Sequence, residues 1–379
     1  MSKVIVLGAG MVGSAMAVDL AKKHQVTLSD LSSEVLKKVK DKCSELTLLQ
    51  LDVTDTKKLQ SDIKQYDLVI NGVPGFIGFE ALRAIIGAEK NVIDIAFFPE
   101  NSLELDALAK KHNVTAIVDC GVAPGMDNVI LGYYNEIMKL SDFECLVGGL
   151  PKTRKWPFYY KAPFSPIDVI EEYRRPARYV EHGEVMVREP LTDCEYVEFD
   201  KLGTLESFNS DGLRSLIYTM PHIPNMKEKT LRYPGHAEYV KVLKESGFFD
   251  TEEIMVKGSK VSPLDFTRQV LFKDWKLGDA EEEITVMRVS LKGENASGQK
   301  EEVIYTLHDE YCSETGTSSM ARTTGYTATA AASLFLEGHF TEKGVFPPEL
   351  VGKYKVCFDY FLEYLEERNI HFVKTTHLI

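Results

Sequence analysis

Short apolar segments alternate with longer amphipathic segments through the first 118 residues, and this alternation constrains the fold more than any other feature. Each apolar segment has the length of a buried strand, and each amphipathic segment has the pattern of a helix. The six apolar segments are residues 4–7, 26–29, 46–51, 68–70, 92–95 and 114–118. Strands that alternate with helices form a parallel sheet covered on both faces. We therefore predict an α/β fold with a doubly wound parallel sheet, whose ligand lies at the carboxyl ends of the strands.

A glycine-rich turn joins the first predicted strand to the first predicted helix and reads GAGMVG over residues 8–13. In a dinucleotide-binding turn, Gly8 makes the tight bend and Gly10 lets the pyrophosphate approach the backbone, while Gly13 lets the helix pack on the strand. The free N–H groups at the helix start, at Met11 and Val12, would bind the phosphates. A purely structural turn is the alternative. The position between strand and helix favours a Rossmann-type dinucleotide-binding domain.

An acidic residue, Asp30, stands at the end of the second predicted strand, twenty residues after Gly10. A carboxylate there can accept hydrogen bonds from the ribose hydroxyls of the adenosine half, and it repels the 2′-phosphate of NADP. The next residues, 31–33, include no lysine or arginine. These features favour NAD as the cofactor over NADP.

Two further turns at the same sheet edge are candidates for cofactor contacts. Asp52 and Val53 follow the third predicted strand and could flank the adenine, although Asp52 could instead cap the helix predicted at 55–65. Val73 and Pro74 follow the fourth strand, where the backbone passes the nicotinamide ribose.

The alternation stops near residue 125, and the later segments have the pattern of antiparallel strands. Residues 284–291 alternate between the two faces, and residues 302–307 follow across a glycine-containing turn, which predicts a hairpin. We therefore predict that a Rossmann domain at 1–124 is followed by a substrate and dimerisation domain at 125–315. This second domain is expected to be α+β, with a mixed or antiparallel sheet.

The C-terminal part is predicted to be helical. Residues 318–337 are dense in alanine, glycine and threonine, and such small side chains allow close approach to a neighbouring helix. A last helix is predicted at 353–368. We expect the segment 316–379 to return and pack on the Rossmann domain.

Composition narrows the classes of partner. The formal net charge of −13 opposes binding to a nucleic-acid backbone. The N-terminal residues do not have the pattern of a signal peptide, and no run reaches the length of a membrane-spanning helix, so a cytoplasmic location is expected. The six cysteines and nine histidines show no zinc-ligand spacing, so no metal site is expected.

Several short segments along the chain carry distinctive motifs, in the order 4–13, 72–76, 119–128 (DCGVAPGMDN), 148–151 (GGLP), 210–214 (SDGLR) and 230–236 (TLRYPGH). Together they resemble the family of saccharopine reductases and lysine dehydrogenases. The length is similar to that of the short lysine 6-dehydrogenase branch, which implies NAD-dependent oxidation of the ε-carbon of lysine with release of ammonia. Ala123 stands where the reductases often carry an aspartate near saccharopine. The resemblance also implies a homodimer with a substrate cleft between its domains.

Oxidation of a C–N bond requires a neutral amine before hydride leaves, and it is helped by a base and by a carboxylate near the developing iminium. His236 is the first candidate for the acid–base residue, because it follows a rigid Pro-Gly turn and histidine titrates in the required range. A histidine that only fixes the turn is the alternative. Asp94 and Asp119 end the fifth and sixth strands, where a carboxylate could stabilise an iminium or cap a loop.

An amino-acid substrate also needs a partner for its α-carboxylate, preferably an arginine that binds with two nitrogens. Arg214 is the first candidate and Arg232 the second, although both could make ion pairs between domains. Tyr160 could line the cleft.

The leading hypothesis is therefore an NAD-dependent amino-acid oxidoreductase that deaminates L-lysine at its ε-amine. An alternative keeps the fold and takes saccharopine or a related secondary amine. A third hypothesis, from another class, is a non-catalytic NAD-binding sensor.

Overall fold

The computed structural model describes residues 1–278 and 281–379. Its N-terminal part is a seven-stranded sheet in the order β17-β6-β5-β4-β1-β2-β3, with every neighbouring pair parallel. The strands are β1 (Lys3–Leu7), β2 (Gln25–Asp30), β3 (Thr47–Gln50), β4 (Leu68–Asn71), β5 (Asn91–Asp94), β6 (Thr115–Ile117) and β17 (Gly344–Phe346). The predicted α/β class and its six strands are confirmed. The seventh strand, β17, comes from far along the chain.

Helices cover both faces of this sheet because its strands are apolar on both sides. In β1, Val4 and Val6 pack into one core and Ile5 and Leu7 into the other, and all four are fully buried. The helices are α1 (Met11–Ala21), α2 (Ser33–Lys42), α3 (Thr56–Asp62), α4 (Gly75–Gly87) and α5 (Asp106–Lys111). The helix predicted at 55–65 is shorter than expected, because a short 3-10 turn occupies Ile63–Gln65.

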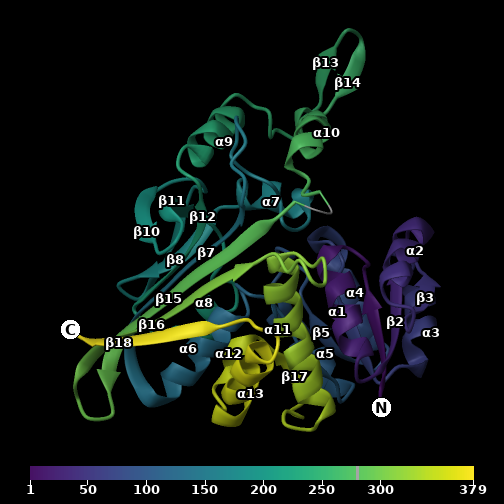
Figure 1. Cartoon of the computed structure of the whole chain (residues 1–379), viewed down its shortest axis with the longest axis horizontal. Coiled ribbons are helices and arrows are strands. Elements are labelled where there is room, and N and C mark those ends of the chain that lie inside the picture. Colours follow the sequence, from purple (N-terminus) through teal and green to yellow (C-terminus); the bar gives the residue numbers. More distant parts are fainter. Residues whose placement is uncertain (279–280) are drawn as a thin grey trace.

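A second, mixed sheet of nine strands is formed within residues 138–378 (Figure 1). Its strands are β7 (Met138–Pro151), β8 (Ala177–Glu181), β9 (Glu184–Arg188), β10 (Glu195–Phe199), β11 (Gly203–Asn209), β12 (Asn225–Arg232), β15 (Glu283–Asn295), β16 (Lys300–Glu310) and β18 (Phe372–Leu378). Only β12 and β7 pair in parallel, and β15 and β16 form the predicted hairpin. The mixed second sheet is therefore confirmed. Its edge strand β18 comes from the C-terminal segment, which was predicted to be helical.

The remaining helices surround the second sheet or connect it to the first. They are α6 (Met126–Ile137), α7 (Pro166–Glu172), α8 (Leu216–Thr219), α9 (His236–Glu245), α10 (Pro263–Trp275), α11 (Ser319–Leu336), α12 (Pro348–Gly352) and α13 (Lys355–Glu366). A small separate sheet pairs β13 (Ile254–Val256) with β14 (Ser259–Val261). Within the described ranges, no helix has the length and apolar character to cross a membrane.

Helix α11 packs on α1, with Gly325 close to Met16 and Val12. Asp19 of α1 accepts hydrogen bonds from Thr329, Tyr364 and Arg368. Burial alone would raise the pKa of Asp19, but the charge and hydrogen bonds of Arg368, together with the Thr329 bond, hold it below its ordinary value. This buried ion pair links the first sheet to the C-terminal helices and so stabilises their arrangement.

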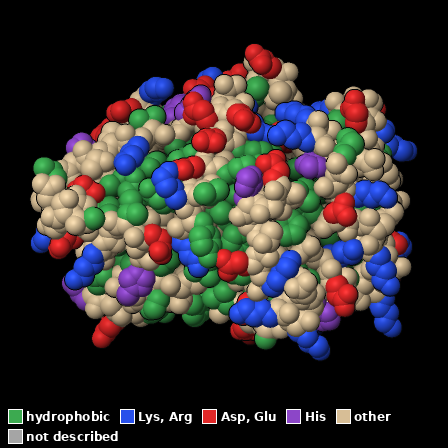
Figure 2. Space-filling view, turned by 90° about the horizontal axis from the view of Figure 1, so that it is seen from below, with side chains coloured by type: hydrophobic (Ala, Val, Ile, Leu, Met, Phe, Trp, Pro, Cys, Tyr) green, Lys and Arg blue, Asp and Glu red, His purple; other side chains and the backbone are tan. Residues whose placement is uncertain are grey.

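The underside of the molecule carries a band of hydrophobic side chains between charged ones (Figure 2). Exposed apolar side chains on elements near the bottom of Figure 1 include Ile137 at the end of α6, Val356 on α13 and Val373 on β18.

Candidate functional site

The glycine turn has the backbone that a dinucleotide site requires. Gly8 has a positive φ of 96°, and a Cβ there would lie 2.6 Å from the Gly72 carbonyl oxygen. At Gly13 a Cβ would lie 1.9 Å from the Gly8 carbonyl oxygen, so this glycine is required for the contact of α1 with the turn. At Gly10 a Cβ would meet no atom of the described chain within 4 Å. The space above Gly10 is therefore open to a ligand.

The start of α1 offers free amides beside this open space. Gly10 is the N-cap and has no side chain to satisfy the first turn, and the Ser14 amide is the first to donate within the helix, to the Gly10 carbonyl (2.9 Å). The amides of Met11, Val12 and Gly13 precede it and have no acceptor within the helix. Free amides and the positive end of the helix dipole together favour a phosphate group.

Asp30 lies at the end of β2, beside the glycine turn. Its two carboxylate oxygens accept hydrogen bonds from the amides of Ala9 and Ser32, both at 2.8 Å. Ser32 in turn caps α2 by accepting from the Val35 amide. Asp30 thus holds the glycine turn against the next helix, and each oxygen keeps a lone pair that a ribose hydroxyl could use.

The other predicted cofactor residues lie along the same sheet edge. Asp52 is exposed, and hydrogen bonds from Thr54 lower its pKa. The cap of α3 is Asp55, which accepts from the Lys58 amide, so the alternative role considered for Asp52 belongs to Asp55. Val73 is buried, and Pro74 is the N-cap of α4.

On the other half of the sheet, polar side chains end the two neighbouring strands β4 and β5. Asn71 ends β4 and donates to the carboxylate of Asp94, which ends β5 and also accepts from the Ala96 amide (2.9 Å). Both side chains are fully buried. Burial, with a smaller contribution from the charge of Asp119, raises the pKa of Asp94 to about 8. A carboxyl group of this pKa can exchange a proton near neutral pH.

Asp119, just after β6, forms an ion pair with an arginine of the second domain. The Nε of Arg214 donates to Asp119 Oδ1 at 2.8 Å, and its Nη1 donates to the Phe98 carbonyl. Both residues are buried, and both have a positive φ, 53° for Asp119 and 43° for Arg214. Left-handed backbone is uncommon at residues other than glycine. The pair joins the two sheets at the predicted ligand edge.

A small cavity of about 50 Å³ opens beside this ion pair. Asp119 and Arg214 line it together with Arg178, whose guanidinium donates to both carboxylate oxygens of Asp211. The further lining residues are Pro99, Glu100, Asn101, Ser102, Ser215 and Tyr218. Sequence reasoning did not select Asn71 or Arg178. Asn71 could have been found, because it ends a strand at the ligand edge, whereas Arg178 was one of several arginines in an irregular segment.

His236 lies away from this cavity, fully buried at the start of α9. Its Nδ1 is 2.9 Å from the Phe158 carbonyl, which can only accept, so Nε2 accepts from the Tyr173 hydroxyl (2.9 Å). The aromatic rings of Tyr160 and Trp275 complete its surroundings. Burial, together with the charge of Arg232, lowers its pKa to about 3. The ring is neutral at physiological pH, and neither nitrogen is free for a substrate.

Arg232 and Tyr160 belong to the same buried network. Arg232 donates from Nη2 to Glu172 (2.9 Å) and lies over the ring of Tyr160, 4.6 Å from its centroid. Both side chains are buried. The structure therefore separates the predicted substrate residues into two groups, with Arg214 at the cavity and Arg232 and Tyr160 inside the second domain.

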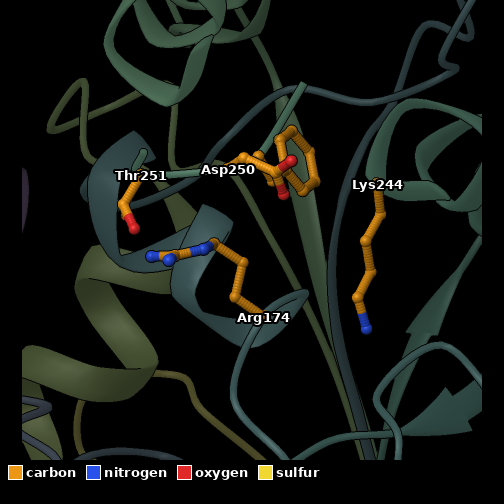
Figure 3. Close-up of a pocket in the computed structure, with 5 residues that line it drawn as sticks. Arg174, Lys244, Asp250 and Thr251 are labelled. Atoms are coloured by element: carbon orange, nitrogen blue, oxygen red, sulfur yellow. The ribbon is translucent and has the colours of Figure 1, made fainter. Parts of the chain in front are cut away.

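A larger cavity, of about 230 Å³, lies in the second domain between α7 and α9 (Figure 3). The guanidinium of Arg174 points toward Thr251, and Lys244 lies on the opposite side (Figure 3). Arg174 is paired with Glu171 and Lys244 with Glu189. Because a carboxylate already neutralises each cation, the cavity is a weak site for a further anion.

One group of metal-ligating side chains occurs within the described residues, formed by Asp127, Cys145 and Glu228 with ligand atoms within 4.8 Å of one another. All three are buried. Burial raises the pKa of Asp127 to about 7 and that of Glu228 well above its ordinary value. Protonation of one carboxyl group supplies a donor to the other, so the cluster can be stable with a proton in place of a metal.

Two family models together match almost the whole chain. The saccharopine dehydrogenase NADP binding domain matches residues 4–117, and the saccharopine dehydrogenase C-terminal domain matches residues 121–370.

Individual relatives are distant. The chain is 27% identical over 263 residues to the NADP(+)-dependent, L-glutamate-forming saccharopine dehydrogenase of Pyricularia oryzae, and the match covers 66% of this chain and 58% of that enzyme. It is 24% identical over 375 residues to the carboxyaminopropylagmatine dehydrogenase of Synechocystis, with 92% of both chains covered. The structure of apo saccharopine dehydrogenase (L-Glu forming) from Saccharomyces cerevisiae superposes with a TM-score of 0.79, 21% identity and full coverage of both chains. This last similarity establishes the shared fold.

Proposed function

Because the chain belongs to the saccharopine dehydrogenase family, we propose that it is an NAD-dependent dehydrogenase that oxidises a C–N bond of an amino acid. The observation that carries the proposal is that Asp94 and Asp119, from two neighbouring strands, lie close to Arg214 of the second domain. This group lies on the half of the sheet where a Rossmann domain holds the nicotinamide. The glycine turn and Asp30 lie on the adenosine half.

When bound, the cofactor would supply the hydride acceptor for oxidation of the carbon that bears the nitrogen. The amides of Met11, Val12 and Gly13 would hold the pyrophosphate, and Asp30 would hold the adenosine ribose. Asp119 faces the small cavity and would pair with the positive charge that develops on the substrate nitrogen. Asp94 lies behind it and would take up the proton that the amine releases. His236 would position Tyr173 and the loop at Phe158.

Two substrate classes are considered, and they differ in what the enzyme releases. Oxidation of the ε-amine of lysine releases ammonia, whereas oxidation of a secondary amine such as saccharopine releases an amino acid. The names of the relatives, which refer to saccharopine and carboxyaminopropylagmatine, favour the second class for this chain. The length of the chain, which is similar to that of the short lysine dehydrogenase branch, favours the first.

A cofactor-linked assay of the purified protein tests the proposal. Lysine with NAD alone should produce NADH and ammonia if the primary amine is the substrate. Saccharopine with NAD should produce NADH without ammonia if the secondary amine is the substrate, and the reverse reaction should then need both an amine and a carbonyl compound. Tight binding of NAD without turnover of either primary or secondary amines would instead support a nucleotide sensor.

NAD specificity is proposed to depend on Asp30. Replacing it by arginine, Asp30→Arg, should weaken NAD binding about tenfold and strengthen NADP binding, since the carboxylate that accepts from the ribose is lost and a cation for the 2′-phosphate is gained. Asp41→Arg is the matched control, because it makes the same change of charge at the exposed C-terminal end of α2, away from the ligand edge, and should change the NAD-to-NADP ratio little. Dissociation constants for NAD and NADP, measured by cofactor fluorescence, give the ratio for each variant. An unchanged ratio in Asp30→Arg would remove the residue from the ribose site.

Arg214 is proposed to bind the substrate carboxylate through the nitrogen that neither Asp119 nor Phe98 uses. Arg214→Ala should raise the KM for the amino acid about tenfold to a hundredfold, with a smaller change in kcat, because a charge-assisted contact is lost in both ground and transition states. Arg214→Lys keeps the charge without the forked geometry, so its KM should lie between those of the wild type and Arg214→Ala. Thermal unfolding of the variants separates this effect from loss of the buried ion pair. A normal KM in Arg214→Ala would exclude the carboxylate role.

The homodimer that the resemblance implies is also part of the proposal. Sedimentation equilibrium of the purified protein tests it independently of activity.

A further inference from the structure

Three arginines of the second domain share the carboxylate of Glu171. The Nη1 of Arg174 and the Nη2 of Arg268 lie 3.0 and 3.2 Å from Glu171 Oε1. The Nε of Arg175 is 3.9 Å from Glu171 Oε2, and Arg175 makes no other ion pair among the described residues. One negative charge thus faces three positive charges, and Arg175 has the weakest share of it. Arg175 is therefore a cation with capacity for a further anion.

The neighbouring acidic groups do not neutralise Arg175. Asp211 accepts with both carboxylate oxygens from Arg178. Asp168 is buried, and burial raises its pKa, which favours the uncharged form. The side chain of Arg175 is only 15% exposed, and burial together with the charge of Arg214 lowers its pKa. A guanidinium still keeps its proton at physiological pH, so an anion from outside the chain would stabilise it.

Arg175 reaches the candidate site through Phe97, which follows β5 at the ligand edge. The Nη1 of Arg175 is 3.4 Å from the Phe97 carbonyl oxygen, and its guanidinium carbon lies 5.0 Å from the centroid of the Phe97 ring. The guanidinium carbon of Arg214 lies 4.8 Å from the same centroid. Within the described chain, the Nη2 groups of both arginines donate to no acceptor. Two guanidinium groups therefore pack on one ring, and each keeps a donor for a ligand.

We propose that Arg175 binds a second carboxylate of the substrate, in addition to the one proposed for Arg214, and so selects amines that carry two carboxylates. This assignment rests on the proposed function. The cofactor does not supply the anion, because its pyrophosphate belongs at the glycine turn after β1 and its adenosine ribose beside β2. In the strand order, β5 lies on the opposite side of β1 from β2. An anion at Phe97 therefore belongs to the substrate.

This second arginine separates the two substrate classes. Lysine has a single carboxylate, so its binding to Arg214 would leave the charge of Arg175 without a partner in the complex. A secondary amine that joins two amino acids carries a carboxylate on each half, and both guanidinium groups would then be paired. The proposal thus favours the secondary amine on charge alone, independently of the names of the relatives.

Simple carboxylic acids test the site without turnover. Glutarate, adipate and pimelate have two carboxylates, whereas pentanoate, hexanoate and heptanoate have the same chain lengths and one. With NAD present, at least one dicarboxylate should bind the full chain about tenfold more tightly than its monocarboxylate partner, because a second charge-assisted contact is gained. Titration calorimetry measures these constants. Equal binding within every pair would overturn the proposal.

Substitution of Arg175 tests which residue gives the preference. Arg175→Gln should weaken dicarboxylate binding about tenfold and leave monocarboxylate binding unchanged. Arg268→Gln is the matched control, because it removes the same charge from the same partner, Glu171, on the α10 side, and it should keep the preference. Arg175→Lys keeps the charge without the forked geometry, so its dicarboxylate constant should lie between those of the wild type and Arg175→Gln. A preference that persists in Arg175→Gln, or that is lost equally in Arg268→Gln, would contradict the assignment.

Turnover gives a separate readout. The wild type should have a lower KM for saccharopine than for lysine, and Arg175→Gln should raise the KM for saccharopine about tenfold with little change in kcat. A lower KM for lysine would count against the proposal. The titrations measure binding, so a protein that oxidises neither amine can still show the dicarboxylate preference, and an active enzyme can lack it. A failure of this proposal is therefore distinct from a failure of the proposed function.

Discussion

Gly10→Ala is expected to weaken dinucleotide binding about a hundredfold, equivalent to about 2.7 kcal/mol, while the midpoint of thermal unfolding stays unchanged. The reason is the open space at this position. A Cβ at Gly10 meets no atom of the described chain within 4 Å, so the free protein accommodates the methyl group, which then occupies the path of the pyrophosphate to the amides of α1. Titration calorimetry with NAD, together with thermal unfolding without it, measures both quantities.

Gly13→Ala, three residues further on, is the matched contrast. Its methyl group would lie 1.9 Å from the Gly8 carbonyl oxygen, a contact that only a shift of α1 can relieve. This variant should therefore lose stability, by about 3 kcal/mol or more, whether or not cofactor is present. If Gly10→Ala bound NAD with the wild-type constant, the pyrophosphate could not lie on this turn, and the assignment of the cofactor site would fail.

Asp94→Asn is expected to lower kcat/KM about a hundredfold to a thousandfold, which is the contribution of a positioned proton acceptor. Asparagine has the shape of aspartate, and the neighbouring Asn71 has an oxygen, Oδ1, without a partner among the described residues. A turn of the Asn71 amide would therefore let it accept from the new side chain, so the fold should tolerate the change. NAD binding should stay within a few-fold of the wild type.

The pH dependence gives a second readout for Asp94. Burial raises its pKa to about 8, so the carboxyl is protonated at neutral pH and ionises as the pH rises through 8. Since only the ionised form can accept a proton, kcat/KM of the wild type should rise through pH 8, and Asp94→Asn should lose this inflection. Glu283→Gln is the control, and it should keep the wild-type inflection. Glu283 is also a buried acid, with a pKa raised by burial to about 7, but it accepts a hydrogen bond from the Met320 amide at the start of α11. A wild-type profile in Asp94→Asn would exclude Asp94 from proton transfer.

The burial of His236 could not be predicted from the sequence. The Pro-Gly turn before it and the ordinary pKa of histidine made it the first candidate for acid–base chemistry. Its neighbours Phe158, Tyr173 and Trp275 come from three separate parts of the chain, and together they bury the ring and hold it neutral. No spacing in the sequence indicates that these segments meet.

Asn71 and Arg178 were not predicted as site residues, for two different reasons. Asn71 ends β4, at the sheet edge where other site residues were predicted, so its place in the site could have been inferred from position alone. Arg178 reaches the cavity because β8 lies beside β12, a pairing between strands far apart in the sequence. The strands β17 and β18 were not predicted, because β17 is too short for a periodic pattern and β18 follows a helix in a segment predicted to be helical.

The linear sequence determined the parallel sheet, the glycine turn and the carboxylates at the strand ends, because each depends on local periodicity or on spacing within one strand–turn–helix unit. Only the tertiary structure decided which charged groups pair, which side chains reach the cavity, and that Asp94 titrates near neutral pH while His236 does not. Those properties depend on burial and on Coulomb interactions between groups distant along the chain, which exist only after the two sheets have packed together.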